Sequence, residues 1–182
     1  MKRRGYSSER DYPSVAEHPF ALYGAFSEVP FGGCLGGIID QASELSAAQM
    51  LRIAQEIGAP ATGFITDIDR DGVSVRFFST VTEYPMCGHV TIGLMTWLTE
   101  RGWFVPETGE SSKTRLRTPG RTSEVEIRLR EDRRPEVLLT LAPAVFEAAV
   151  VNAVDLAQML DLSQGSLRDD LDMKITSTDF RS

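Results

Sequence analysis

The stretch that decides the fold runs over residues 83–93 and reads EYPMCGHVTIG. Pro85 ends the element before it, because a proline ring cannot continue a helix or a central strand. The apolar residues that follow predict a helix over residues 90–101. Cys87 and His89 therefore lie at the start of a helix, where free backbone amides and the helix dipole provide partial positive charge.

This placement suits the binding and the proton chemistry of a small acid. The amides of residues 88–91 form a site for a carboxylate. The same field would lower the pKa of the Cys87 thiol from its usual value of about 8.5, which suits an acid, a base or a nucleophile. The imidazole of His89 titrates near neutral pH. We therefore take Cys87 and His89 as candidate catalytic residues. The candidate substrate-binding residues are Gly88, His89, Val90 and Thr91.

A structural interpretation of the same residues stays open. Cys87 would then be a small buried side chain, as most lone cysteines are, and His89 would cap the helix or bond a carbonyl group. The chain has two cysteines, Cys34 and Cys87, too few for the disulfide framework of a secreted protein. Because no further Cys or His lies close to the Cys-Gly-His triplet in sequence, we expect no metal site.

Before this stretch, the sequence predicts two strands and a helix. The strands cover residues 20–26 and 35–40, and both are rich in apolar residues. Ser46 and Gln49 have the spacing of a capping box, which satisfies two backbone amides at the start of a helix. Gly58 is the expected helix terminator.

Residues 61–66 and 73–79 predict two further strands. Their connector, DIDRDG at residues 67–72, begins like a calcium-binding loop of the pattern D-x-D-x-D-G. The twelfth position of such a loop supplies a bidentate Glu, but that position is Phe78 here. We therefore predict a hairpin turn and no calcium site.

After the helix at 90–101, the pattern predicts two or three strands between residues 115 and 141. The clearest strand covers residues 124–130, where apolar and charged residues alternate as in a half-buried antiparallel strand. A third helix is predicted at 152–162, and a further strand at 173–178.

The composition is that of a globular protein. The chain has 182 residues, 42% of them hydrophobic and 25% charged, which excludes collagen-like and wholly disordered proteins. No apolar run reaches the roughly 18 residues of a membrane span, and no apolar signal region follows the basic N-terminus, so we expect a cytoplasmic protein without a membrane partner. The net charge is −7, and the arginines of residues 113–135 alternate with acids, so we expect no nucleic-acid partner.

Several segments resemble the phenazine-biosynthesis PhzF family, in the order and spacing of that family. They read FALYGAFSEVPFGGCLGGIID at 20–40, LSAAQMLRIAQEIG at 45–58, ATGFI at 61–65 and VRFFSTVTEYPMCGHVTIG at 75–93. The part that reads MCGHVTIG is also similar to the signature of proline racemases and hydroxyproline epimerases. Both groups share the diaminopimelate epimerase fold, in which two pseudo-symmetric halves each wrap a curved sheet around a central helix.

The resemblance implies an α+β chain with a diaminopimelate epimerase-like half-fold, a curved and mostly antiparallel sheet wrapped around a central helix. It divides the chain into a loose leader at 1–19, an N-terminal epimerase-like half at 20–150, and a crossover helix with the first strand of a truncated second half at 151–182. An apolar face left by the missing half would favour a homodimer.

The resemblance also implies a function. Members perform cofactor-independent proton transfer on small carboxylic acids, so we expect an isomerase or epimerase of an amino or hydroxy acid, in secondary metabolism, without a cofactor. In racemase-type members, the cysteine that matches Cys87 is one of two thiols flanking the substrate carbon. In PhzF-type members, the residues that match Gly88 and His89 line the substrate site, and a glutamate transfers the proton.

The chain departs from the family pattern at positions that matter. Ala61 stands where the proton-transferring glutamate belongs, and the family's G-N-P turn reads Gly33, Cys34 and Leu35. Glu83 matches a family glutamate and is either a substitute base or, as we favour, a structural hydrogen-bonder. A catalytically inactive half-fold that binds a small ligand or dimerises is therefore the alternative function, and a structural role without a ligand is the third.

Overall fold

The structure is a computed structural model, which describes residues 17–107, 109–141, 143–148, 152–167 and 174–177. Most of the predicted leader lies outside these residues. Its last residue, Pro19, accepts a hydrogen bond from the amide of Asp40 at 2.9 Å. The elements follow one another as β1 (Phe20–Ala25), β2 (Cys34–Ile39), α1 (Ala47–Ile57), β3 (Ala61–Ile68), β4 (Gly72–Phe78), β5 (Glu83–Tyr84), α2 (Gly88–Glu100), β6 (Ser111–Thr118), β7 (Arg121–Leu129), β8 (Pro135–Leu139), β9 (Val145–Ala148), α3 (Ala153–Met159), a 3-10 turn (Gln164–Ser166) and β10 (Lys174–Ser177).

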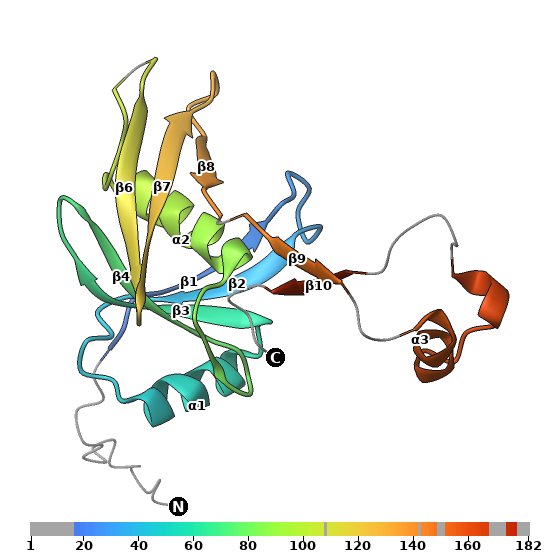
Figure 1. The fold of residues 1–182 in the computed structure, drawn as a ribbon. Helices are drawn as coiled ribbons and strands as arrows, with labels where there is room; N and C mark the ends of the chain where they lie inside the picture. The colour runs from blue at the N-terminus through green and yellow to red at the C-terminus, as the bar shows by residue number, and fades with distance from the viewer. Residues whose placement is uncertain (1–16, 108, 142, 149–151, 168–173, 178–182) are drawn as a thin grey trace, which may run out of the picture.

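One curved sheet wraps around α2, as the resemblance implied (Figure 1). Its strand order is β1-β2-β3-β4-β6-β7-β8, and β5 pairs with β4. The β2–β3 and β4–β6 pairs are parallel, and the other pairs of this sheet are antiparallel. Because α2 contacts β1 at one end of the sheet and β8 at the other, the sheet curves around the helix. The predicted α+β fold, mostly antiparallel and built around a central helix, is confirmed.

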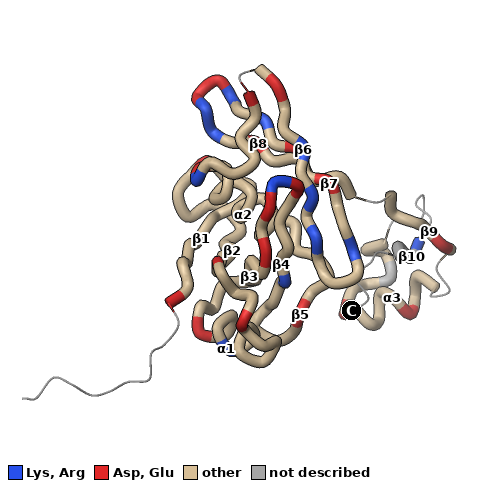
Figure 2. The backbone as a smooth tube through the Cα atoms, turned by 90° about the vertical axis from the view of Figure 1, so that its left-hand side faces the viewer, with Lys and Arg blue, Asp and Glu red and all other residues tan. Residues whose placement is uncertain are grey.

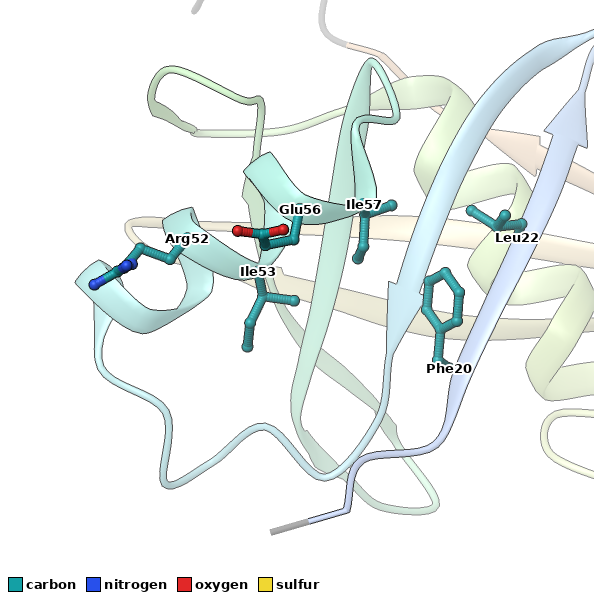
Figure 3. Close-up of a pocket in the computed structure, with 6 residues that line it drawn as sticks. All are labelled: Phe20, Leu22, Arg52, Ile53, Glu56 and Ile57. Atoms are coloured by element: carbon teal, nitrogen blue, oxygen red, sulfur yellow. The ribbon is translucent and has the colours of Figure 1, made fainter. Parts of the chain in front are cut away.

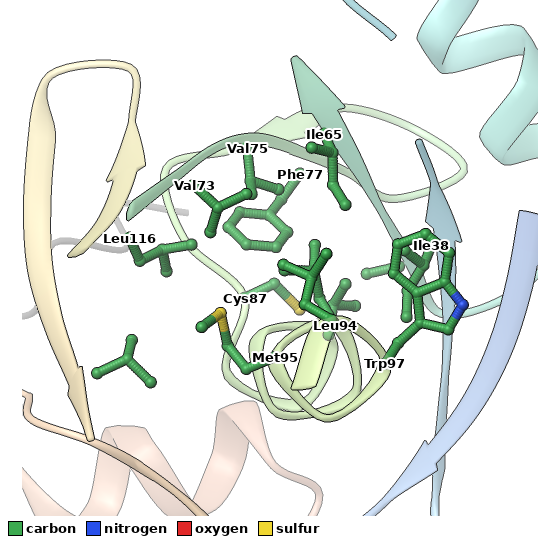
Figure 4. Close-up of a cluster of buried hydrophobic side chains, with 14 of the residues drawn as sticks. Ile38, Ile65, Val73, Val75, Phe77, Cys87, Leu94, Met95, Trp97 and Leu116 are labelled. Atoms are coloured by element: carbon green, nitrogen blue, oxygen red, sulfur yellow. The ribbon is translucent and has the colours of Figure 1, made fainter. Parts of the chain in front are cut away.

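Burial on several sides makes α2 the central helix. Its buried residues are Val90, Thr91, Gly93, Leu94, Met95, Trp97, Leu98 and Thr99. A helix that is apolar around most of its circumference is stable only when protein covers it on several sides. Figure 4 shows α2 side chains packed against residues of β3 and β4, among them Ile65, Val75 and Phe77. A second cluster, around Met50 and Phe64, lies under α1.

The local signals for α1 are confirmed. The side chain of Ser46 accepts a hydrogen bond from the amide of Gln49, and the Gln49 side chain accepts one from the amide of Ser46 at 2.9 Å. Gly58 ends the helix in the left-handed conformation, with φ of 68°. Glycine reaches this conformation without the steric cost that a side chain would impose.

The DIDRDG connector is a hairpin turn between the antiparallel strands β3 and β4, as predicted. The carboxylate of Asp69 accepts hydrogen bonds from the amides of Asp71 and Gly72 at 2.8 and 2.9 Å. It also accepts one from the Arg117 guanidinium at 2.7 Å, which holds the pKa of Asp69 below its usual range. These bonds are those of a turn closed by its own side chain.

The ends of several elements differ from the sequence-based expectations. Helix α2 begins at Gly88, two residues before the predicted start, and Cys87 is its N-cap. The short strand β5 was not predicted. Strand β7 starts at Arg121, because polar residues before 124 still pair with β6 along the whole hairpin. Polar residues give no alternating apolar pattern from which a strand could be predicted, but the backbone hydrogen bonds between strands do not depend on apolar side chains.

Strand β9 was also not predicted, because its residues are exposed and carry no alternation. It pairs antiparallel with β10 in a separate two-stranded sheet. The predicted boundary at residue 150 falls between these two strands in the sequence. Figure 1 shows α3 apart from the curved sheet.

The basic residues of β6 and β7 have acidic neighbours (Figure 2). Lys113 lies 2.8 Å from Glu124 on the paired strand, and Arg128 lies 2.7 Å from Glu126. The alternating charges predicted a solvated strand face, and these ion pairs lie on such a face. Within the described ranges, no helix is long and apolar enough to cross a membrane.

Candidate functional site

The start of α2 is held against two glycines in the neighbouring parallel strands β2 and β3. A Cβ atom at Gly36 would lie 3.0 Å from Cγ2 of Val90, and one at Gly63 would lie 2.9 Å from Cγ1 of Val90. Such distances are too short for ordinary packing, so both positions favour glycine. This close approach places Cys87 and His89 beside the first residues of β2.

Cys87 and His89 lie in contact with each other. The Cys87 Sγ atom is 3.4 Å from His89 Nδ1, and Cys87 is 8% exposed. Figure 4 shows the Cys87 side chain in the apolar cluster near Leu94 and Met95. The structure thus brings the two predicted catalytic side chains together, but with the sulfur covered.

The expected lowering of the Cys87 pKa is wrong. Burial raises the pKa of this thiol, although the backbone amides of Val90 and His89 act in the opposite direction. The sequence places the thiol at a helix start, but it does not show that the sulfur turns into the core. Removal of water disfavours the thiolate, and here this effect exceeds that of the amides.

The surroundings of His89 favour its neutral form. Burial lowers the pKa of its imidazole, and a hydrogen bond with the backbone of Leu35 acts in the opposite direction. Burial thus favours the uncharged form of both groups, and the tautomer of His89 decides which of them donates the hydrogen bond. The pair is therefore a covered acid with a polar partner, rather than a thiolate and an imidazolium.

The raised pKa of Cys87 predicts a pH dependence. In a Cys34→Ser variant, we expect the thiolate absorbance at 240 nm to appear at higher pH for the folded chain than for the chain in guanidinium chloride. As pH rises, the thiol of the unfolded chain releases its proton first. The contribution of the protonated Cys87 to the free energy of unfolding is therefore complete below the pKa of the unfolded thiol, and it is lost as pH rises through the pKa of the folded one. Coincident titrations of the folded and unfolded chains would contradict the assignment.

The open side of the helix start is formed by Gly88. No atom lies within 4 Å of a Cβ built at this residue. Val90 and Thr91 face the core instead. The Thr91 amide donates to the Cys87 carbonyl oxygen at 2.9 Å, and its hydroxyl donates to the same oxygen at 2.8 Å. Of the amides that precede Thr91, those of His89 and Val90 interact with the Cys87 sulfur, and that of Gly88 lies on the open side.

Ala61 lies where the resemblance places a glutamate. It pairs with Gly36, is 1% exposed, and belongs to the same apolar cluster as Cys87. The segment around residue 61 thus reaches the start of α2, but it contributes a methyl group that cannot transfer a proton.

Glu83 has a structural partner. Its two carboxylate oxygens each accept a hydrogen bond of 2.7 Å from Arg76. The Arg76 guanidinium also lies over the ring of Phe78, 5.3 Å from its centroid. A bidentate pair of this kind fixes β5 against β4. The geometry supports the structural interpretation of Glu83.

Cys34 is the other thiol of the chain, and the sequence predicted no role for it. It lies at the start of β2, opposite Ala25 of β1, and it is exposed. Because side chains alternate along a strand, Cys34 is on the same face as Gly36 and points toward the α2 side of the sheet. The sequence shows that residues 34 and 36 share one face of a strand. Only the structure shows that this face is turned toward α2.

A cavity of about 480 Å³ lies elsewhere, between β1 and α1 (Figure 3). It is lined by Phe20, Leu22, Arg52, Ile53, Glu56 and Ile57. None of these residues belongs to the group around Cys87. The cavity therefore lies on the α1 side of the sheet, whereas Cys34, Cys87 and His89 lie on the α2 side.

Comparisons with known proteins agree with this architecture. The family model described as PhzC-PhzF, phenazine biosynthesis-like protein, matches residues 23–181. The uncharacterized isomerase YfhB of Bacillus subtilis is 27% identical over 157 residues, which cover 86% of this chain and 52% of that protein. The trans-2,3-dihydro-3-hydroxyanthranilate isomerase of Pseudomonas chlororaphis is 34% identical over 77 residues, which cover 42% of this chain and 28% of that protein.

Solved structures are similar in fold. A phenazine biosynthesis protein of the PhzF family from Bacillus anthracis matches with a TM-score of 0.73 and 25% identity, over 90% of this chain and 54% of that one. A Pseudomonas aeruginosa protein described as a predicted epimerase matches with a TM-score of 0.75 and 19% identity, over 88% and 56%. The chain thus spans about half the length of these two proteins.

Proposed function

The chain belongs to the phenazine biosynthesis-like family PhzC-PhzF, and on this premise we propose that it serves isomerase- or epimerase-type proton transfer on a small carboxylic acid. Curated relatives are named isomerases, which supports this kind of reaction. The observation that carries the proposal is the contact between Cys87 and His89 at the start of α2, next to the open position of Gly88.

The substrate carboxylate binds at the start of α2. The backbone amides at the start of α2 provide partial positive charge, and that of Gly88 lies on the open side of the helix end. A proton on a carbon near a carboxylate is weakly acidic, so charge that develops on the carboxylate must be stabilised. Fixed amide dipoles do this without reorganising during the reaction. The reaction moves a proton alone, so the proposal includes no cofactor.

Cys87 acts as the acid of this site. It is protonated at neutral pH, and His89 is its hydrogen-bond partner. A protonated thiol can deliver a proton to a carbanion-like carbon, and water then restores a proton to the thiolate, which stays in contact with the neutral imidazole. The free thiols of Cys34 and Cys87 fit a reducing, cytoplasmic setting.

A second protein surface closes the site. The side of Gly88 is open, and proton abstraction from carbon benefits from the exclusion of water. We propose that a second copy of the chain supplies this surface in a homodimer. The wider biological setting that we propose is secondary metabolism, after the phenazine biosynthesis-like family.

A ligand-binding protein without catalysis is the second candidate function. Ala61 favours it, because the residue that faces the start of α2 from β3 has no ionisable group. In this case the amides of α2 would still bind a carboxylate.

The experiment is hydrogen exchange with solvent. The chain is incubated in D2O with trans-2,3-dihydro-3-hydroxyanthranilate and, separately, with a panel of α-amino and α-hydroxy acids, and deuterium incorporation is followed by NMR. We expect exchange above the buffer rate, and a roughly 10²- to 10⁴-fold decrease in His89→Ala. The matched control is His18→Ala, which removes the chain's other histidine, one that lies beside Asp40.

The two candidate functions give different results. Exchange at the buffer rate, together with binding of one of these acids by calorimetry, would reject catalysis in favour of ligand binding. Equal exchange by wild type and His89→Ala would show that the reaction occurs away from this pair.

A further inference from the structure

The proposed reaction needs a group that removes a proton, and the residues considered so far do not supply a good one. Ala61 has no ionisable group. Cys87 is covered and protonated. The imidazole of His89 already has two partners, the Cys87 sulfur at 3.4 Å and the backbone of Leu35. A base for this site must therefore be accessible and must lie on the same face of the sheet.

The register of β2 places Cys34 on that face. Cys34 and Gly36 are two residues apart in one strand, paired with Ala25 and Tyr23 of β1. A Cβ atom at Gly36 would point at the start of α2, 3.4 Å from the Val90 Cα atom and 3.6 Å from Cδ2 of His89. Because side chains two residues apart share a face, the Cys34 side chain lies on the same side, further toward the end of the sheet.

Exposure distinguishes the two thiols. Cys34 is exposed, whereas Cys87 is buried. The two sulfurs are nevertheless close enough that charge on Cys34 raises the pKa of Cys87. One thiol is thus exposed at the start of β2, and the other is buried in contact with His89.

Cys34 also lies near Ala61, the residue that stands where the resemblance places a glutamate. Gly36 separates them: it pairs with Ala61 across β2 and β3, and it follows Cys34 by two residues along β2. Ala61 is 1% exposed, and Val90 lies 3.0 Å from a Cβ built at Gly36, so Val90 covers Ala61, whereas Cys34 stays exposed at the start of β2. A small ligand bound at the α2 amides would lie beside Cys34.

We infer that Cys34 is the proton-transfer residue of this site, an inference that rests on the proposed function. Its thiolate takes a proton from a carbon of the bound acid: the S–H bond forms, the C–H bond breaks, and the electron pair moves into the adjacent conjugated system. Cys87, the acid of the site, gives its proton to another carbon of the same system, and water then takes the proton from Cys34 and restores one to Cys87. Atoms and electrons balance among the substrate, the two thiols and water, so no oxidant or second reactant is needed.

The first test compares exchange rates. In D2O with trans-2,3-dihydro-3-hydroxyanthranilate, we expect Cys34→Ser to exchange roughly 10²- to 10⁴-fold more slowly than wild type. Because Cys34 is exposed, the thermal midpoint of Cys34→Ser should equal that of wild type. The matched control is Ser43→Ala, also at an exposed position, which should exchange at the wild-type rate. Exchange by Cys34→Ser at the wild-type rate would overturn the inference and leave the proposed function intact.

The second test does not depend on turnover. Wild-type chain is treated with iodoacetamide, and modification of each cysteine is followed by peptide mass spectrometry with and without the same acid. We expect Cys34 to react faster than Cys87, and the acid to protect Cys34. Faster reaction of Cys87, or a Cys34 rate that the acid does not change, would overturn the inference. Protection of Cys34 without any exchange by the wild type would reject proton transfer for Cys34 and the catalytic function together, and would leave a carboxylate-binding site.

Discussion

We expect the substitution Phe77→Ala to lower the free energy of unfolding by about 3–5 kcal/mol. Phe77 lies on β4 with 0% of its surface exposed, in the cluster that joins the sheet to α2. A Cβ atom at Gly63 would lie 3.3 Å from its ring, which shows how closely the sheet packs there. Alanine would remove the ring and leave a cavity that the rigid sheet cannot fill by collapse. Urea denaturation, followed by circular dichroism, measures the change.

The matched control for this substitution is Phe31→Ala. Phe31 is the most exposed large hydrophobic residue among those described, at 107%. The same loss of a ring should change stability by no more than about 0.5 kcal/mol there, because surface substitutions have small effects. Equal losses in the two variants would contradict the core described for β4 and α2.

The second large effect is expected from Gly72→Ala, which acts on the backbone of the sheet. Gly72 starts β4 and pairs with Arg115 of β6 in the parallel ladder that joins the two parts of the curved sheet. A Cβ atom at Gly72 would lie 2.2 Å from the carbonyl oxygen of Arg115. Since this neighbour is backbone rather than the end of a flexible side chain, β4 and β6 must move apart. We expect a loss of about 1–3 kcal/mol, as for other overpacked sites.

Hydrogen exchange localises this effect. The Arg115 amide donates to the Asp71 carbonyl oxygen at 3.1 Å, so amides of β6 should exchange faster in Gly72→Ala. The matched control is Gly165→Ala, because no atom lies within 4 Å of a Cβ built at that glycine. Unchanged protection of β6 in Gly72→Ala would show that the parallel pair tolerates the methyl group.

Both effects bear on the candidate site. The face of the sheet that carries Phe77 packs against α2, and the start of α2 holds Cys87 and His89. Loss of this packing would release the helix start from Gly36 and Gly63. We therefore expect the site to respond to core substitutions that do not touch it.

Local sequence signals predicted the elements that depend on near neighbours. The capping box of Ser46 and Gln49, the terminator Gly58 and the turn at Asp69 all act within a few residues, and all are confirmed. Strand β5 was missed because it has only 2 residues, and strand β9 because its residues are exposed and its partner β10 lies further along the chain. Pairing with a distant strand leaves no periodic pattern in such a segment.

The sequence by itself determined the family, the central helix and the presence of a thiol and an imidazole at its start. These follow from the order of residues along a short segment, where proline, glycine and apolar spacing act locally. Only the tertiary structure decided how that site behaves. It turned the Cys87 sulfur into the core, where loss of water raises the thiol pKa, and it left Cys34 exposed on the same face of the sheet. Solvation depends on which distant strands cover a side chain, and that is settled when the sheet closes around the helix.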